Sequence, residues 1–245
     1  NVMFSYNKKI IQVENNTHFN NSKHYCVGMP LRLMRVKYLN QSNKPTPPIV
    51  FISTNLYNRG FSLSGYTDYQ RARNEQTLIN EVWSKLPHKV CYKTYPEDNR
   101  RYADRDPVFS DVNKAKNMEL FSKKIDMRYL ISNFKILVTT SATSTIGWPV
   151  MSNKPVVFIN QEKHMPLTND AYLSFSKGLF VFNDYEKDFY KDLRDFLSLP
   201  LNEIERLWVE KQKDREDMIK NYFSFYADGK AGKRASQIIL EEFMA

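Results

Sequence analysis

Residues 135–159 read KILVTTSATSTIGWPVMSNKPVVFI, and this stretch decides the fold. Its two ends, residues 135–139 and 155–159, are short apolar runs rich in β-branched side chains, which is typical of buried parallel strands. Between them we expect a short helix over residues 144–152. A strand, a helix and a second strand in succession predict a right-handed βαβ unit.

Similar patterns extend on both sides of this unit. Further apolar runs of strand length stand at residues 49–53, 89–93 and 178–182. Helices are expected at residues 69–86 and 114–133, and in a tail that starts at residue 186 and breaks at Asp228 and Gly229. The alternation of strands with helices predicts an α/β fold, in which a Rossmann-like, doubly wound parallel sheet is followed by a helical C-terminal tail.

A proline-rich polar segment, QSNKPTPP at residues 41–48, separates this regular pattern from the residues before it. Because proline cannot continue a helix, we expect this segment to be a linker. Residues 1–46 would then hold an N-terminal segment and the linker, as the remnant of an N-terminal domain, and residues 47–245 would form the Rossmann-like domain. Within the first part, residues 9–13 (KIIQV) have the character of a strand.

Composition narrows the choice of partner. The chain of 245 residues is 42% hydrophobic, which suffices for a packed core, and its net charge of +9 suits an anionic partner. Nucleotide sugars, acidic polysaccharides, nucleic acids and an anionic membrane surface all meet that description. A nucleic-acid-binding module is disfavoured, because basic residues are mixed with acidic ones and no nucleic-acid-binding motif occurs.

The two cysteines, Cys26 and Cys91, match no metal-binding or redox spacing. No apolar run approaches the ~20 residues that a helix needs to cross a bilayer. We therefore expect a cytoplasmic protein with reduced cysteines and no bound metal.

The loop inside the opening stretch carries the most chemistry. Ligands of a parallel sheet bind outside the carboxyl ends of the strands, and this loop begins at such an end. Its candidate ligand-binding residues are Ser141, Thr143, Ser144, Thr145 and Gly147. A helix cap needs a single hydroxyl, so the surplus of hydroxyls at a helix start favours phosphate binding. An ordinary Ser/Thr cap is the alternative.

A second loop follows the apolar run at residues 89–93. Lys93 and Arg100 are expected to neutralise a diphosphate or a sugar carboxylate, on either side of Tyr95 and Pro96. The acidic pair in the same loop is suited to accept hydroxyl groups and provides the local candidates for a catalytic acid or base, Glu97 and Asp98. A solvated charged turn is the alternative.

A third loop follows residues 49–53 and opens at the same edge of the predicted sheet. Its glycines and aromatic residues suit a mobile substrate contact, for which Asn55 and Arg59 are the candidates. A plain surface loop explains the same residues equally well.

Together, the loop that contains Tyr95 and Pro96 and the later sequence ILVTTSATSTIGWPVMSNKPVVFIN (residues 136–160) resemble a known family. They look like the C-terminal, donor-binding domain of the GT-B glycosyltransferases that build bacterial capsules and lipopolysaccharide. The similarity is greatest to the Kdo- and sialyltransferase-like groups, which use CMP-sugars. Tyr95 and Pro96 stand at the His-Pro motif of those enzymes and Ser144 and Thr145 at their Ser-Ser/Thr motif, and DGKAGKR (residues 228–234) is similar to their DGKAxxR tail.

The resemblance implies a metal-independent glycosyltransferase, or its nucleotide-sugar-binding domain. It would transfer Kdo or a related acidic sugar from a CMP-linked donor to a glycan or glycolipid acceptor of bacterial surface polysaccharide, with no cofactor beyond the nucleotide sugar. Separately, the basic surface or the aromatic-rich residues 222–226 suit peripheral association with the inner face of the cytoplasmic membrane, with helix packing in the core as the alternative for the aromatic cluster.

The sequence departs from this pattern in two places. Tyr95 replaces the usual histidine, and Trp148 and Pro149 occupy the region where many UDP- and GDP-sugar enzymes carry a ribose-binding acid. The second departure favours a cytidine nucleotide. A CDP-glycerol-type wall polymer transferase and a non-catalytic scaffold domain of a larger polysaccharide synthase remain the alternatives.

Overall fold

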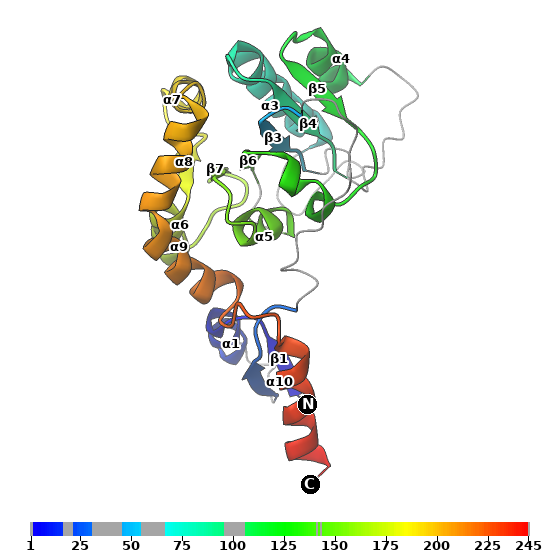
Figure 1. Ribbon diagram of the computed structural model, residues 1–245, viewed down its shortest axis with the longest axis vertical. Helices are drawn as coiled ribbons and strands as arrows, with labels where there is room; N and C mark the ends of the chain where they lie inside the picture. The colour runs from blue at the N-terminus through cyan, green and yellow to red at the C-terminus, as the bar shows by residue number, and fades with distance from the viewer. Residues whose placement is uncertain are drawn as a thin grey trace.

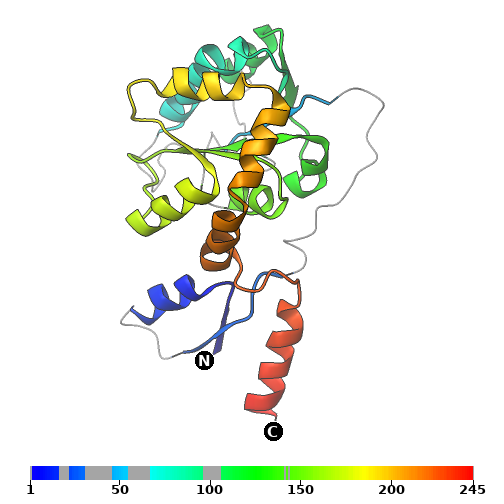
Figure 2. The same cartoon turned by 60° about the vertical axis from the view of Figure 1, so that its left-hand side comes forward.

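The computed structural model of the chain describes residues 2–16, 22–30, 46–54, 67–95, 106–140, 142 and 144–244. Figures 1 and 2 show a larger α/β body built around a parallel sheet and, below it, a smaller unit that contains both ends of the chain. A long run of helices, coloured from yellow to red, leads from the larger body to the smaller one.

The larger body is built on a six-stranded sheet in which every neighbouring pair of strands is parallel. Across the sheet, the strands are β5 (Met118–Phe121), β4 (Val90–Lys93), β3 (Ile49–Ile52), β6 (Ile136–Thr139), β7 (Val156–Asn160) and β8 (Phe180–Asn183). Every residue of β3, β4, β6 and β7 is buried, which accounts for the continuous apolar runs in the sequence. The predicted doubly wound parallel sheet is confirmed.

Helices cover both faces of the sheet. The chain starts at the centre with β3 and moves out to β5 through α3 (Asp68–Glu81) and α4 (Pro107–Lys114). It returns to the centre at β6 and moves out to β8 through α5 (Ser144–Met151) and α6 (Asn169–Gly178). Because right-handed crossovers that run in opposite directions place their helices on opposite faces, α3 and α4 lie on one face and α5 and α6 on the other.

The C-terminal tail is helical, as predicted. It consists of α7 (Phe189–Leu197), α8 (Leu201–Glu210), α9 (Gln212–Met218), a π-helical turn (Ile219–Phe223) and α10 (Ala231–Phe243). Helix α7 packs beside α3, where Arg194 Nη1 donates to the Glu81 carbonyl at 2.9 Å. The helical tail is interrupted before α10 at the predicted residues, where Gly229 has a φ of +70°.

Both ends of the chain build the smaller unit. Strands β1 (Val2–Ser5) and β2 (Lys23–Cys26) are parallel, and α1 (Lys8–Asn15) connects them. This βαβ unit is tied to the last part of the chain: Asn7 Nδ2 donates to the Tyr222 carbonyl at 2.9 Å, and Arg234 of α10 donates to the Val27 carbonyl at 3.0 Å. At Gly28, whose φ is +84°, an added Cβ would lie 2.7 Å from the Tyr226 carbonyl oxygen.

Two secondary-structure predictions were wrong. Residues 9–13 were expected in a strand but lie in α1, because Asn7 caps a helix there by accepting a hydrogen bond from the Ile10 amide at 3.0 Å. Residues 114–133 were expected in a helix but contain β5. Asn117, directly before β5, anchors this segment beside the sheet, because its Nδ2 donates to the Trp83 carbonyl at 2.8 Å. Strand β5 then pairs with the edge of β4 that faces away from β3.

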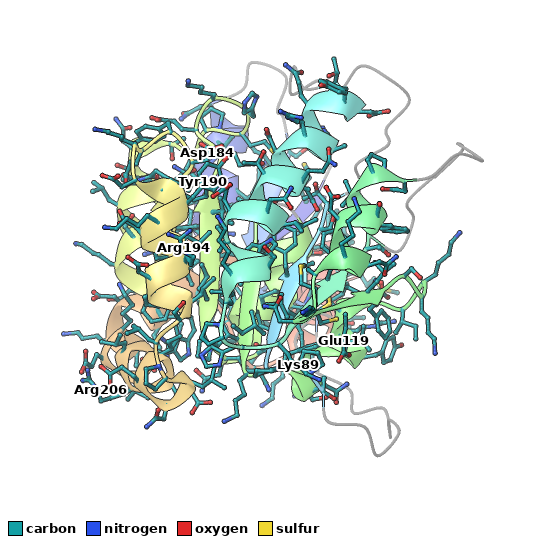
Figure 3. All side chains as sticks on the ribbon, turned by 90° about the horizontal axis from the view of Figure 1, so that it is seen from above. Lys89, Glu119, Asp184, Tyr190, Arg194 and Arg206 are labelled. Carbon is teal, nitrogen blue, oxygen red and sulfur yellow. The ribbon has the colours of Figure 1, made fainter. Side chains whose placement is uncertain are left out.

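Of the helices that the structure describes, none is long and apolar enough to span a bilayer. Figure 3 shows the strands lengthwise behind α3 and α7, so the two ends of the sheet are separated in this view. Lys89 and Glu119 lie at one end, near the starts of β4 and β5, whereas Asp184 and Tyr190 lie at the other, which is the carboxyl edge of the sheet.

Candidate functional site

The order of the strands places a topological switch point between β3 and β6. The chain leaves β3 towards β4 and leaves β6 towards β7, so the connections diverge where Ile52 pairs with Thr139. Open α/β sheets bind ligands at such a point, outside the carboxyl ends of the strands. Buried hydroxyl side chains mark this edge, from Ser53 after β3 and from Thr139 and Thr140 at the end of β6.

Helix α5 begins directly beyond β6, with Ser144 and Thr145 as its first residues. The amide groups of a helix start point outward and carry partial positive charge, which favours an anion. At Gly147, none of the described atoms lies within 4 Å of the position that a Cβ would take, so the first turn of the helix is open there. Two other members of the predicted phosphate site, Ser141 and Thr143, lie outside the described residues.

Lys93 lies at the end of β4, and its side chain is buried, with only 1% of the residue exposed. The ammonium group donates to the Thr94 carbonyl at 2.5 Å and lies 5.5 Å from the centre of the Phe121 ring. Tyr95 follows two residues later and is partly buried. The remaining residues predicted for this edge lie outside the described residues: Pro96, Glu97, Asp98, Arg100, Asn55 and Arg59. The roles assigned to all of these side chains stay predictions.

Sequence reasoning missed a buried carboxylate beneath the switch point. Glu75 of α3 accepts a hydrogen bond from Ser53 Oγ at 2.8 Å and a very short one from the Tyr92 hydroxyl. Tyr92 and Ser53 are also within hydrogen-bonding distance, at 3.1 Å. This network joins α3 to the ends of β3 and β4 and fixes the Ser53 side chain. A signal was present, because Glu75 interrupts the apolar stripe that Ala72, Leu78 and Ile79 form on α3.

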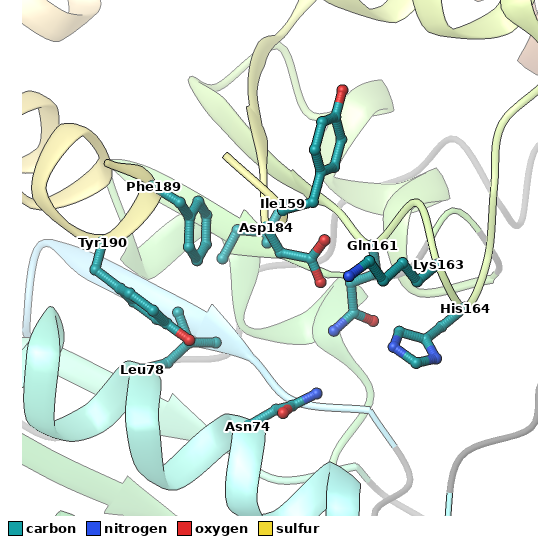
Figure 4. Close-up of a pocket in the computed structure, with 10 residues that line it drawn as sticks. Asn74, Leu78, Ile159, Gln161, Lys163, His164, Asp184, Phe189 and Tyr190 are labelled. Carbon is teal, nitrogen blue, oxygen red and sulfur yellow. The ribbon is translucent and has the colours of Figure 1, made fainter. Parts of the chain in front are cut away.

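A pocket of about 190 Å³ opens at the same edge, between α3, α7 and the loops that follow β7 and β8. Its apolar side is formed by Leu78, Ile159 and Phe189, all of which are buried. Figure 4 shows the side chains of Asn74, Gln161 and Asp184 pointing into the same space, with Lys163, His164 and Tyr190 around them. Tyr185 also lines the pocket. Sequence reasoning did not identify these residues.

Burial shifts the ionisation of several groups in this pocket. It raises the pKa of the Asp184 carboxyl, an effect that nearby Lys163 partly opposes. It also raises the pKa of the Tyr190 hydroxyl and lowers the pKa of His164, which Lys163 lowers further. The pocket therefore favours neutral forms of its ionisable side chains more than water does.

Within the part of the chain that the structure describes, no group of three or more His, Cys, Asp or Glu side chains could hold a metal ion. The polar groups described at the carboxyl edge are amides, hydroxyls, a helix start and single charged side chains.

Known structures share this fold. A glycosyltransferase from Rickettsia africae ESF-5 matches with a TM-score of 0.54 and 11% identity over 98% of this chain, and TarM with 0.50 and 14% over 96%. UGT2 of Phytolacca americana, solved with UDP-2-fluoro-glucose and pterostilbene, matches with 0.50 and 13% over 98%. These matches cover 63%, 42% and 52% of the respective structures, so the chain spans less than two thirds of each.

No protein-family model matches the sequence, and neither does any curated protein. At the identities of the structural matches, the likeness establishes the fold: this is a Rossmann-like sheet of the GT-B type with helices on both faces and a helical C-terminal end.

Proposed function

We propose that this chain is the donor-binding part of a glycosyltransferase, which transfers a sugar from a nucleotide-activated donor to a glycan. The observation that carries the proposal is the start of α5 at the switch point, with an open first turn at Gly147. Such a helix start binds the phosphate of a nucleotide. The fold is also that of the Rickettsia glycosyltransferase and of UGT2, whose structure holds a UDP-sugar.

In the proposed reaction, an acceptor hydroxyl attacks the anomeric carbon of the donor sugar as the bond to the phosphate oxygen breaks. The hydroxyl proton passes to a base, and the negative charge develops on the departing phosphate. The amide groups and dipole of α5 would stabilise that charge without a metal. Glu97 and Asp98 are the proposed acid or base of this chain, and the net charge of +9 would attract the anionic donor.

The proposed donor is a CMP-linked acidic sugar, Kdo or a relative, and the proposed acceptor is a bacterial capsule or lipopolysaccharide glycan. This finer assignment rests on the resemblance of Ser144 and Thr145 to the Ser-Ser/Thr motif and on Trp148 and Pro149 in place of a ribose-binding acid. A CDP-glycerol-type wall polymer transferase would use the same cytidine site. The same proposal includes peripheral association of the enzyme with the inner face of the cytoplasmic membrane.

The division into an N-terminal segment with its linker (residues 1–46) and a Rossmann-like nucleotide-sugar-binding domain (residues 47–245) is likewise proposed. The βαβ unit of β1, α1 and β2 supports it, because that is the repeating unit of a Rossmann-like domain. A non-catalytic scaffold role is the second candidate.

The test is nucleotide binding by a variant that combines Ser144→Ala with Thr145→Val. We expect calorimetry to show weaker binding of CMP and CDP by about 1–3 kcal/mol, because hydrogen bonds to a charged group are lost. Ser236→Ala on the exposed side of α10 is the matched control and should bind normally. Unchanged affinity in the double variant, with the fold intact, would return these hydroxyls to the role of an ordinary helix cap.

The cytidine preference has its own test, a thermal-shift comparison of CMP, CDP, UDP and GDP on the unaltered protein. Stronger stabilisation by CMP or CDP is expected, and the reverse order would refute the donor assignment while leaving the phosphate site in place.

A further inference from the structure

Helix α10 contacts the rest of the smaller unit through one of its sides. Ala231 is buried on that side, and Arg234 donates to the Val27 carbonyl at 3.0 Å. Glu242, in the last turn, forms an ion pair with Lys23 at 2.6 Å. Figures 1 and 2 show α10 at the end of the molecule that lies away from α3 and α7.

Three large apolar side chains lie on a different side of the helix. Ile239, Leu240 and Phe243 are 42%, 56% and 61% exposed, and their spacing places them on one face. Gly232 and Ser236 lie on the same face, one and two turns before Ile239. We call the surface that these five residues form the outer face of α10. Exposed apolar side chains that gather in this way are typical of an interaction surface.

We propose that the outer face of α10 binds the same face of a second copy of this chain, so that two α10 helices pack antiparallel about a two-fold axis. This inference goes beyond the proposed function and does not depend on it. Helix α10 contributes no residue to the switch point or to the pocket between α3 and α7.

The shape of the outer face complements itself in the antiparallel direction. Its first half is small, because it consists of Gly232 and Ser236, and none of the described atoms lies within 4 Å of the position that a Cβ of Gly232 would take. Its second half is large and ends at Phe243. Antiparallel packing sets the large half of each helix against the small half of the other, whereas parallel packing would set Phe243 against Phe243 and leave a gap beside Gly232.

The charges of α10 favour the same direction. Lys230 and Lys233 lie at its start, Glu241 and Glu242 lie at its end, and its first turn has no acidic residue and its last turn no basic one. This order opposes the macrodipole of the helix, whose start is positive and whose end is negative.

An antiparallel second helix reverses that relation. Lys233 of one copy then lies beside the negative end of the second helix and near Glu241 of that copy. Arg234 and Glu242 already have partners in their own chain, Asp228 and Lys23. Lys233 and Glu241, by contrast, form no ion pair within the part of the chain that the structure describes. Their charges are therefore available to a second copy.

The size of the outer face indicates a reversible dimer. A helix of 13 residues is ~20 Å long, and one face of such a helix offers much less than the ~800 Å² per partner of a standard interface. We therefore expect a dissociation constant in the micromolar range.

Sedimentation equilibrium of the whole chain at a series of concentrations measures the association. Leu240→Glu should raise the dissociation constant of the dimer about a hundredfold or more, because each dimer then buries two charged side chains in place of two leucines. Leu173→Glu is the matched control, since Leu173 lies on α6 and is 59% exposed. This control should associate as the unaltered protein does.

Exchange of charges tests the direction of packing. Lys233→Glu and Glu241→Lys should each raise the dissociation constant by about threefold or more, because each brings like charges together at both ends of the helix pair. The double variant restores opposite charges and should dimerise as the unaltered protein does. In a parallel pair each position would face its own copy, so the double variant would behave like the single ones.

Three results would overturn the proposal: a protein that stays monomeric at every concentration, a Leu240→Glu variant that dimerises normally, or a double charge variant that is not restored. Circular dichroism checks that each variant is folded, and the charge variants test the interface independently of Leu240→Glu. Co-sedimentation with phosphatidylglycerol vesicles tests the other occupant. A monomeric protein that Leu240→Glu releases from vesicles would assign the outer face to a membrane.

CMP titration separates this proposal from the proposed function. All of these variants should bind CMP with the affinity of the unaltered protein, because the proposed phosphate site lies at α5. Failure of the unaltered protein to bind CMP would refute the nucleotide site and leave the dimer to be judged by sedimentation alone.

Discussion

Removing one hydroxyl, in Tyr92→Phe, tests whether Glu75 organises the edge of the sheet where ligands are proposed to bind. The Tyr92 hydroxyl and the Glu75 carboxylate are buried together, and the same hydroxyl lies 3.1 Å from Ser53 Oγ. A hydrogen bond to a charged group contributes about 1.5–3 kcal/mol, and its loss leaves a buried carboxylate with one donor fewer. We expect the free energy of unfolding to fall by about that amount.

Thermal and urea unfolding, followed by circular dichroism, measure the change. At ~2–4 °C per kcal/mol for a chain of this size class, the melting temperature should fall by about 3–12 °C. Tyr69→Phe is the matched control, because Tyr69 lies on the same α3 helix and is 74% exposed. Its free energy of unfolding should change by no more than ~0.5 kcal/mol.

A double-mutant cycle with Glu75→Gln then isolates the contact between the two side chains. Residues in one buried network are coupled by about 0.5–3 kcal/mol, so the double variant should be less destabilised than the sum of the single ones. If Tyr92→Phe is as stable as Tyr69→Phe, or if the two changes are strictly additive, the carboxylate does not depend on this hydroxyl and the reasoning fails.

Three further predictions follow from single positions. Lys93→Met keeps an apolar side chain in the buried site but removes the ammonium group that is proposed to attract the donor. It should weaken nucleotide binding at least tenfold, about 1.4 kcal/mol, in calorimetry. Equal affinity per folded molecule would show that the role of Lys93 is purely structural. Gly28→Ala should lower the free energy of unfolding by more than ~1 kcal/mol, because the φ of Gly28 is +84° and the new Cβ would lie 2.7 Å from the Tyr226 carbonyl oxygen. Gly232→Ala, at an open position of α10, should instead raise it by roughly 0.5–1 kcal/mol. Similar urea midpoints for the two variants would contradict this prediction. Burial raises the pKa of the Cys91 thiol to about 12, whereas the same thiol in the unfolded chain has a pKa of ~8.5. The folded state therefore keeps this proton at pH values where the unfolded chain loses it, so the contribution of Cys91 to stability should be fully present below ~pH 8.5 and fall as the pH rises towards 12. Cys91→Ala should reduce this pH dependence of the free energy of unfolding, as measured by urea titrations at several pH values.

The sheet was predictable from the sequence because its strands are buried on both faces. β3, β6 and β7 therefore appear as uninterrupted apolar runs. Helix α5 begins and ends close to the expected residues, whereas α3 begins as expected but ends at Glu81 and is followed by a separate 3-10 turn over Trp83–Lys85. β5 gave no such signal, since Glu119 interrupts it and only Met118 is buried. Its conformation depends on pairing with β4 and on the contacts of Asn117, both of which join distant parts of the chain.

The candidate site was predictable only in part. A loop rich in hydroxyls before a helix can be recognised locally, so Ser144 and Thr145 could be placed at the edge of the sheet from the sequence. The partnership of Glu75 with Tyr92 and the convergence of Asn74 with Asp184 arise from the packing of α3 on the sheet and beside α7. No local pattern of residues in the sequence predicts contacts of that kind.

The pairing of residues 2–30 with the end of the chain sets the order of events during synthesis. The sheet from β3 to β8 and its covering helices can assemble while translation continues, since they draw on residues 49–218. The βαβ unit of residues 2–26 cannot complete its contacts until Tyr222, Ser224 and Arg234 have left the ribosome, because these residues hydrogen-bond to Asn7, Met29 and Val27 in and directly after the unit. Residues 2–30 are therefore made before the sheet but meet these partners only after the sheet can have assembled.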